Sequence, residues 1–136
     1  MILDTSFLID LMNGQEGAVE RAATIEGMET VQRVPATVVY ELYVGVGYTE
    51  RPNAEVAKIQ TVLDSRPIVE TNERIAKLAG RLDGDLRREG NRVSPMDILV
   101  GAAARHVDEP VVTGNPGDFE PIPDVEVNTY RDRTDP

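Results

Sequence analysis

The chain begins with the stretch MILDTSFLI at residues 1–9, in which an apolar strand runs straight into a helix. Met1 to Leu3 are apolar and predict a buried strand that stops at Asp4. Ser6 is the expected cap of a short helix that extends to about Met12. This arrangement places a carboxylate at the carboxyl end of a strand, where open parallel sheets collect their ligands.

The rest of the chain continues this alternation of strands and helices. Further strands are predicted near residues 31–34, 68–69, 110–113 and 125–127. Helices are predicted near residues 17–28, 37–46, 54–63, 73–90 and 94–107, with a turn near residues 45–53. This order predicts an α/β fold with a central parallel sheet of four to five strands and helices on both faces. We expect a single domain over residues 1–130 and a frayed tail over residues 131–136.

The composition restricts the possible chemistry. The sequence has no cysteine and a single histidine, His106, which excludes disulfides, thiolate nucleophiles and metal sites built on cysteine or several histidines. A bound metal must therefore be held by oxygen. No apolar run approaches the roughly 20 residues of a membrane span, and no signal peptide is recognisable, so we expect a cytoplasmic protein outside the membrane.

The charge is strongly acidic, with 24 Asp and Glu residues against 14 Lys and Arg residues and a net charge of −10. This charge argues against sequence-blind adhesion to nucleic acid or anionic membranes, but it is compatible with a local basic groove. Only Lys58 and Lys77 stand beside twelve arginines. An acid-rich, lysine-poor chain is typical of a high-salt cytoplasm, where a Debye length of about 3 Å at 1 M mutes self-repulsion.

Three carboxylates stand alone in apolar segments. Asp4 is the one charged residue of residues 1–9, Glu41 of residues 34–49 and Asp97 of residues 93–104. A buried carboxylate is costly unless it is paired, hydrogen-bonded or bound to a cation. The three acids lie at a strand end, inside a helix and in the first turn of a helix, and they are therefore predicted to converge on a cation.

Each of these acids also has a purely structural interpretation. Asp4 can cap the helix that follows it, and Asp97 can complete a capping box with Ser94. Glu41 lies in the middle of its helix, where capping cannot explain it, but a position at the exposed edge of the helix can.

A fourth candidate, Asp118, lies in the polar loop after the strand at residues 110–113. Turn chemistry is its structural alternative, and Glu120 competes with it as a ligand. Because this loop and Asp4 both follow strands, their side chains are expected at one edge of a parallel sheet. A carboxylate cluster there suits Mg²⁺ or Mn²⁺, which prefer oxygen ligands and can activate water against a phosphodiester.

Four blocks of the sequence carry a family resemblance. They are MILDTSFLI at residues 1–9, ELYVG at 41–45, DILVGAAA at 97–104 and TGNPGDF at 113–119. Their order and spacing resemble those of PIN domains, and in particular those of the short VapC-type toxins of type II toxin–antitoxin systems. The sequence departs from the family pattern at Val100 and Gly101, where isoleucine and alanine are frequent, and at Gly114, where a larger residue is commoner.

The resemblance implies a PIN-like three-layer α/β/α fold and a Mg²⁺- or Mn²⁺-dependent ribonuclease. By this match the metal site would consist of four carboxylates: Asp4, Glu41, Asp97 and Asp118. Four neighbours would support them by hydrogen bonding: Thr5, Ser6, Thr113 and Asn115. The resemblance further implies an RNA substrate, a homodimer, and a cognate antitoxin protein that inserts a segment near the acidic pocket.

Arginines and tyrosines add weaker expectations. The three arginines before Asp97 could grip the RNA backbone, although basic residues at a helix end also complement its dipole; they are Arg87, Arg88 and Arg92. Three tyrosines are expected mainly in the core, with the helix edge that carries them as a candidate partner surface; they are Tyr40, Tyr43 and Tyr48.

Other functions stay open at this point. One is an RNA-processing PIN nuclease without a toxin role, and another is a catalytically silent PIN-like binding module. An Asp-nucleophile phosphatase fits poorly, because Ser6 stands where a second aspartate is needed. A phosphorylated receiver also fits poorly, because neither Lys58 nor Lys77 follows a late strand.

Overall fold

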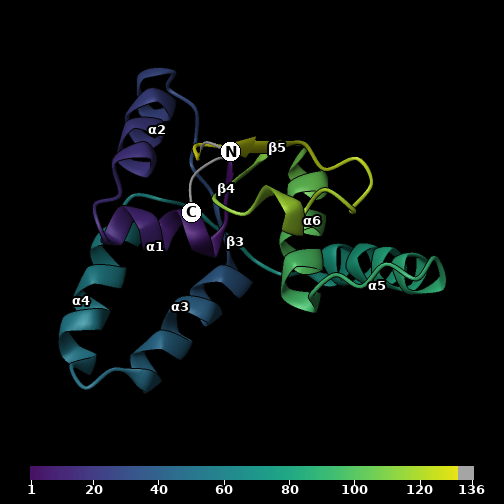
Figure 1. Ribbon diagram of the computed structural model, residues 1–136, viewed down its shortest axis with the longest axis horizontal. Coiled ribbons are helices and arrows are strands. Elements are labelled where there is room, and N and C mark those ends of the chain that lie inside the picture. Colours follow the sequence, from purple (N-terminus) through teal and green to yellow (C-terminus); the bar gives the residue numbers. More distant parts are fainter. Residues whose placement is uncertain (132–136) are drawn as a thin grey trace.

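The computed structural model describes residues 1–131 (Figure 1). The tail predicted over residues 131–136 falls, except for its first residue, on residues 132–136, which lie outside the described part of the chain. Within residues 1–131, no helix is both long and apolar enough to cross a membrane.

Five short strands of the described chain run parallel to one another. β1 (Ile2–Leu3), β4 (Val111–Thr113) and β5 (Val127–Thr129) form a sheet in the order β1-β4-β5. β2 (Val34–Pro35) and β3 (Ile68–Val69) form a second parallel pair. A bridge between Ile2 and Arg33 joins this pair to β1, and the Leu3 amide donates to the Arg33 carbonyl at 2.9 Å. The strands therefore follow one another as β3-β2-β1-β4-β5, which confirms the predicted parallel α/β arrangement.

The direction in which strands are added reverses at β1. From β1 the chain adds β2 and β3 on one side, and it then returns to place β4 and β5 on the other. Ile2 is paired with Val111 and Leu3 with Val112, so Asp4 and Thr113 come next to each other at the carboxyl end of the sheet. Open parallel sheets bind ligands at such a switch point.

Helices cover both faces of the strands. Those before β3 are α1 (Thr5–Met12), α2 (Glu16–Gly27), α3 (Ala36–Tyr48) and α4 (Pro52–Leu63). Those after it are α5 (Glu73–Arg88), α6 (Pro95–Val107) and the single 3₁₀ turn η1 (Pro116–Asp118). Figure 1 shows α5 and α6 on one side of the strands and α1, α2 and α4 on the other. α3 contacts both α1 and α6, so it connects the two helical layers.

The core lies between the strands and these helices. Ile2, Leu3, Val111 and Val112 are fully buried, because helices cover both faces of the central strands. Ile98 to Ala104 of α6 supply small and branched side chains to the same core. Among the described residues, the polar side chains buried in it are those of Asp4 and Thr113. The cost of burying a carboxylate therefore falls at the carboxyl end of β1.

Some local predictions were wrong. α1 begins at Thr5, and the Ser6 hydroxyl bonds to the Asp4 carboxylate instead of capping the helix. Asp4 occupies the N-cap position, but its side chain makes no capping hydrogen bond. α3 continues through Gly45 and Gly47, where the sequence predicts a turn. Packing of α3 on α1 and α4 offsets the cost of these glycines, which is about 1 kcal/mol each in a helix interior.

Candidate active site

The carboxylate of Asp4 is the buried centre of the site. Only 5% of the residue is exposed, and its Oδ2 accepts hydrogen bonds from Thr113 Oγ1 at 2.8 Å and Ser6 Oγ at 2.9 Å. Burial raises the pKa of Asp4, and the nearby charge of Asp118 raises it further, whereas the two hydroxyl bonds oppose the rise. The chain thus holds a carboxylate in a position that favours a compensating cation.

A hydrogen-bonded network ties the loop after β4 to the start of α1. The Gly114 amide donates to Ser6 Oγ at 3.0 Å, and the Asn115 amide donates to Thr113 Oγ1 at 3.0 Å. The two hydroxyls lie 3.1 Å apart. Because both hydroxyls also contact Asp4, the position of this loop and the position of the carboxylate depend on each other.

Glu41 reaches the site from the middle of α3. Thr5 Oγ1 donates to Glu41 Oε1 at 2.8 Å, so the residue after Asp4 holds the second carboxylate. Glu41 is half-buried; burial raises its pKa, the Thr5 bond opposes the rise, and the charge of Asp4 adds to it. Glu41 thus lies at a partly exposed edge of α3, but its carboxylate is held by a hydrogen bond from the start of α1.

Asp97 reaches the site from the first turn of α6. Burial, as the main cause, raises the pKa of Asp97 to about 7. The further causes are the negative charges of Asp4, Asp118 and Glu41, in that order. Ser94 occupies the N-cap of α6, but its side chain makes no capping hydrogen bond, so the predicted capping box is not formed.

Asp118 ends the η1 turn and is exposed to solvent. Its charge nevertheless acts on both Asp4 and Asp97, which places it in the same electrostatic neighbourhood. Glu120, the competing candidate, is also exposed two residues further along the chain. Asp97 therefore feels the charges of three further carboxylates, which come from three other parts of the chain.

The donor chemistry of these carboxylates fits a hard divalent cation. Within residues 1–131, no three acidic or histidine side chains stand close enough together to form a ready-made ligand set. Mg²⁺ does not require one, because it keeps several waters and is commonly bound through one or two carboxylates together with substrate phosphates. Asp4, Glu41 and Asp97 all have a raised pKa, caused first by burial, and a bound cation would favour their charged forms.

The predicted arginines occupy different environments. Arg87 is paired with Asp83 at 2.8 Å, and Arg88 lies 3.6 Å from Asp85 on the exposed surface of α5. Arg92 forms no ion pair with any described residue. Arg87 and Arg92 line a cavity of about 250 Å³ beside the beginning of α6, whereas Arg88 does not.

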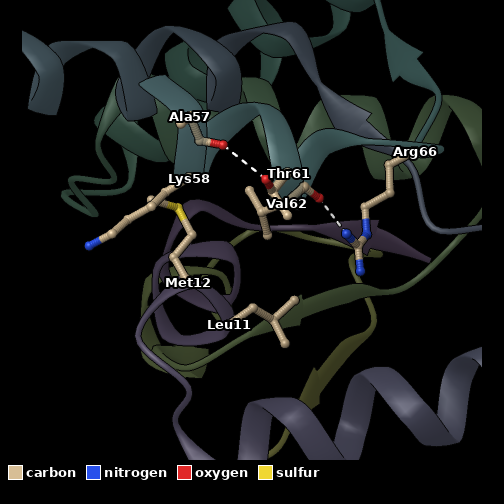
Figure 2. A pocket seen from close by; sticks show the side chains of 7 residues that line it. All are labelled: Leu11, Met12, Ala57, Lys58, Thr61, Val62 and Arg66. Atoms are coloured by element: carbon tan, nitrogen blue, oxygen red, sulfur yellow. Dashed lines mark hydrogen bonds between the residues drawn. The ribbon is translucent and has the colours of Figure 1, made fainter. Parts of the chain in front are cut away.

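A different cavity, of about 500 Å³, lies between α1 and α4 (Figure 2). Its lining is mostly apolar and includes Leu11 and Met12 from α1 and Val62 from α4. Lys58 and Arg66 stand at opposite ends of it in Figure 2. None of the four carboxylates lines this cavity, so its chemistry is separate from theirs.

The tyrosines of α3 are not in the core, contrary to the main expectation. Tyr40, Tyr43 and Tyr48 are 64%, 41% and 89% exposed, respectively. The helix buries Val38 and Leu42 instead, and these lie on the opposite face of α3. The alternative expectation, a tyrosine-bearing helix edge open to a partner, agrees with this exposure.

A polar cluster next to the site was not predicted from the sequence. Arg131 and Tyr130, at the carboxyl end of β5, both donate hydrogen bonds to Asp10 in α1. Arg131 is thus ion-paired, although the sequence assigns it to the tail. Asp10 is separated from Tyr130 by 120 positions and from Arg131 by 121, so no local sequence pattern indicates these contacts.

Residues 1–123 match the PIN domain, and the chain belongs to the PIN domain family. Its fold is similar to that of the VapBC toxin–antitoxin proteins. No protein with a curated description matches the chain.

Solved structures of such proteins superpose over nearly the whole chain. A chain of VapBC from Salmonella typhimurium, solved bound to DNA, matches with a TM-score of 0.85 and 22% identity over 96% of this chain and 97% of that one. A chain of a VapBC from Rickettsia felis, bound to a promoter DNA fragment, matches with a TM-score of 0.86 and 19% identity over 94% and 96%. A VapC from Mycobacterium tuberculosis, described as a sarcin–ricin loop cleaving toxin, matches with a TM-score of 0.60 and 16% identity over 83% and 86%.

Proposed function

We propose that this PIN-domain protein is a metal-dependent endoribonuclease that hydrolyses RNA phosphodiester bonds and acts as the toxin of a toxin–antitoxin pair. The observation that carries the proposal is the raised pKa of Asp97, caused by burial and by three further carboxylates from α3, η1 and the end of β1. A fold alone does not require such a concentration of like charge, whereas a site for a divalent cation does.

Mg²⁺ or Mn²⁺ is the cation that these residues suit. Asp4 and Asp97 would hold it, with Glu41 and Asp118 as the outer carboxylates that bind it directly or through water. When bound, such an ion polarises a phosphodiester, lowers the pKa of water and neutralises charge on the leaving oxygen. Because Asp97 must lose its proton to become a ligand, we expect metal affinity to increase as the pH rises through about 7.

The supporting residues act by fixing the carboxylates. Ser6 and Thr113 hold Oδ2 of Asp4, and Thr5 holds Oε1 of Glu41. The backbone amide of Asn115 restrains the Thr113 hydroxyl, and Asn115 itself is exposed. These contacts preorganise the site, which is where a nuclease gains most from its scaffold.

A substrate of RNA needs a local source of positive charge, because the chain as a whole carries −10. Arg92 is the best placed of the three predicted arginines, because no described acid neutralises it and it lies close in sequence to Asp97. Arg87 shares its cavity but is paired with Asp83. Arg88 does not line that cavity, so we expect it to contribute less to RNA binding.

The toxin role rests on the structural neighbours, which include toxin–antitoxin complexes from several bacteria. An antitoxin protein would need an exposed apolar surface, and the tyrosine edge of α3 offers one beside Glu41. A homodimer and a cytoplasmic location belong to the same proposal. An RNA-processing nuclease without a toxin role and a silent binding module are the alternatives.

Cleavage assays test the proposal directly. The purified protein is incubated with total RNA and with random-sequence RNA oligonucleotides in Mg²⁺, in Mn²⁺ and in EDTA. We expect cleavage with either metal, none in EDTA, and none for Asp4→Asn, while the matched control Asp64→Asn, an exposed position at the end of α4, cleaves normally.

The outcomes separate the alternatives. RNA binding without cleavage in any metal would favour the silent module, and cleavage that persists in EDTA would overturn the metal mechanism. Growth arrest on expression of the wild-type chain but not of Asp4→Asn supports the toxin role. Active enzyme without growth arrest would favour RNA processing.

A further inference from the structure

The carboxyl end of β5 folds against α1 through a compact polar cluster. Tyr130 Oη, Arg131 Nε and Arg131 Nη2 all donate hydrogen bonds to Oδ2 of Asp10, and the Nε distance is 3.1 Å. The Asp10 side chain is 13% exposed, so the carboxylate is well shielded from water, whereas the Arg131 side chain is 34% exposed. We call Asp10, Tyr130 and Arg131 the C-terminal clamp.

Apolar and backbone contacts reinforce the clamp. The ring of Tyr130 packs on the fully buried ring of Phe7, with 5.1 Å between the ring centroids. Arg21 from α2 donates to the Thr129 carbonyl at 3.2 Å. Burial and the neighbouring Asp10 charge both raise the pKa of Tyr130, which therefore keeps its proton and remains a donor.

The clamp lies directly on the loop of the proposed site. A Cβ added to Gly114 would come within 2.7 Å of Tyr130 Oη and 3.0 Å of Arg131 Nε, so the clamp occupies the space that a side chain at residue 114 would need. The amide of this same glycine donates to Ser6 Oγ, which in turn donates to Asp4. The clamp is therefore separated from the central carboxylate by Gly114 and Ser6 alone.

We infer that the C-terminal clamp positions the loop of residues 114–118, and with it Asp118, relative to Asp4. The expected effect on catalysis rests on the proposed function, whereas the effect on the position of the loop does not. Tyr130 and Arg131 are positioning residues: they touch the loop from outside and act through Gly114. α1 supplies Ser6, whose hydroxyl accepts a hydrogen bond from the Gly114 amide, and Asp10, which binds Tyr130 and Arg131. One helix therefore sets the distance between the loop and the site.

A purely structural role would give a different result. If the clamp only attached β5 to the domain, its loss would lower overall stability and leave the properly folded fraction fully active. If it positions the loop, the folded protein itself has a displaced Asp118, and a small misplacement can reduce the rate of a reaction up to about a hundredfold. The two roles therefore differ in kcat and in local opening of the loop.

The test compares Arg131→Ala with a matched control, Arg33→Ala. Arg33 forms an ion pair of similar exposure with Glu109, at 2.8 Å, and Glu109 also pairs with the amino group of Met1, at the end of β1 opposite to Asp4. Amide hydrogen exchange at Gly114 and Asn115 is measured in the full-length proteins, together with kcat and KM for RNA cleavage. Arg131→Lys, which keeps the charge, serves as the conservative variant.

We expect exchange at Gly114 and Asn115 to become about tenfold faster in Arg131→Ala and to stay unchanged in Arg33→Ala. We also expect kcat to fall by about tenfold or more in Arg131→Ala with KM nearly constant, and Arg131→Lys to recover part of that loss. If Arg131→Ala does not fold, Tyr130→Phe removes one hydroxyl from the clamp and should show the same direction of change in both measurements.

The positioning role would be overturned if the Gly114 and Asn115 amides of Arg131→Ala exchange at the wild-type rate. It would also be overturned if their exchange becomes equally faster in Arg33→Ala. A wild-type protein that cleaves no RNA would overturn the proposed function instead, and the exchange measurement would then decide the inference about the clamp by itself.

Discussion

Replacing Asp97 with asparagine should stabilise the metal-free protein at alkaline pH. The pKa of Asp97 rises from 3.8 to about 7 in the folded chain, so the charged form is disfavoured there. A rise of about three pH units corresponds to roughly 4 kcal/mol for a group shielded completely from water. Because Asp97 is only half-buried, solvent screening reduces this figure, and we expect a gain of about 1–2 kcal/mol for Asp97→Asn.

The sign of this effect depends on pH. Between about pH 4 and pH 7 the folded wild-type chain keeps a proton on Asp97 that the unfolded chain has lost, so the free energy of unfolding falls as the pH rises through this window. Above about pH 7 both states have lost the proton, and the penalty is complete. The variant lacks this contribution, and its advantage over the wild type should therefore grow from about pH 4 to pH 7 and then level off.

Urea unfolding in EDTA at pH 5 and pH 8 measures the difference, with Asp64→Asn as an exposed control. Added Mg²⁺ should raise the melting temperature of the wild type, and this gain should shrink in Asp97→Asn because a ligand is lost. An Asp97→Asn protein that is less stable than the wild type in EDTA at pH 8, and that keeps its full response to Mg²⁺, would show that Asp97 is neither destabilising nor a metal ligand. A loss of about 0.5–2 kcal/mol in Asp97→Ala under all conditions would instead indicate a helix cap.

Other predictions follow from the same site and charge. Glu41→Gln should leave metal-free stability equal or higher and reduce the Mg²⁺-dependent gain in melting temperature; a destabilised variant with a full gain would make Glu41 part of the scaffold. Arg92→Ala should raise KM for RNA several-fold while Arg88→Ala leaves it unchanged, as measured by steady-state cleavage. The protein should form a dimer and fold best at high salt, because a net charge of −10 must be screened before two subunits associate. Light scattering across a salt series measures the oligomeric state, and a stable, active monomer at low salt would contradict this prediction.

Much of the fold follows from local patterns. The apolar strands near residues 31–34, 68–69 and 110–113 and the long amphipathic helix that begins at Glu73 are found close to their predicted places. The predictions that failed depend on neighbours: Gly45 and Gly47 remain helical because α3 is packed along α1 and α4, and the tyrosines of α3 are exposed because Val38 and Leu42 fill its inner face.

The candidate carboxylates could be identified from residue patterns alone. A lone acid in an apolar segment is costly to bury, so Asp4, Glu41 and Asp97 could be singled out without any knowledge of the fold. Their shared electrostatic environment could not be derived in this way, because it depends on which strand lies beside β1. The sheet places β4 there, which brings Thr113 to Asp4 across 109 positions of the chain.

The contacts made by the carboxyl end of the described chain depend on the folded arrangement and could not be predicted. Local sequence sets helical periodicity and strand ends through interactions of near neighbours, and it carries no such signal for a contact between Asp10 and Arg131. That contact exists because β5 pairs with β4 and ends above α1, where a glycine at residue 114 leaves space for Tyr130. The chemistry of the site was therefore readable from single residues, whereas its geometry depends on strand order and close packing.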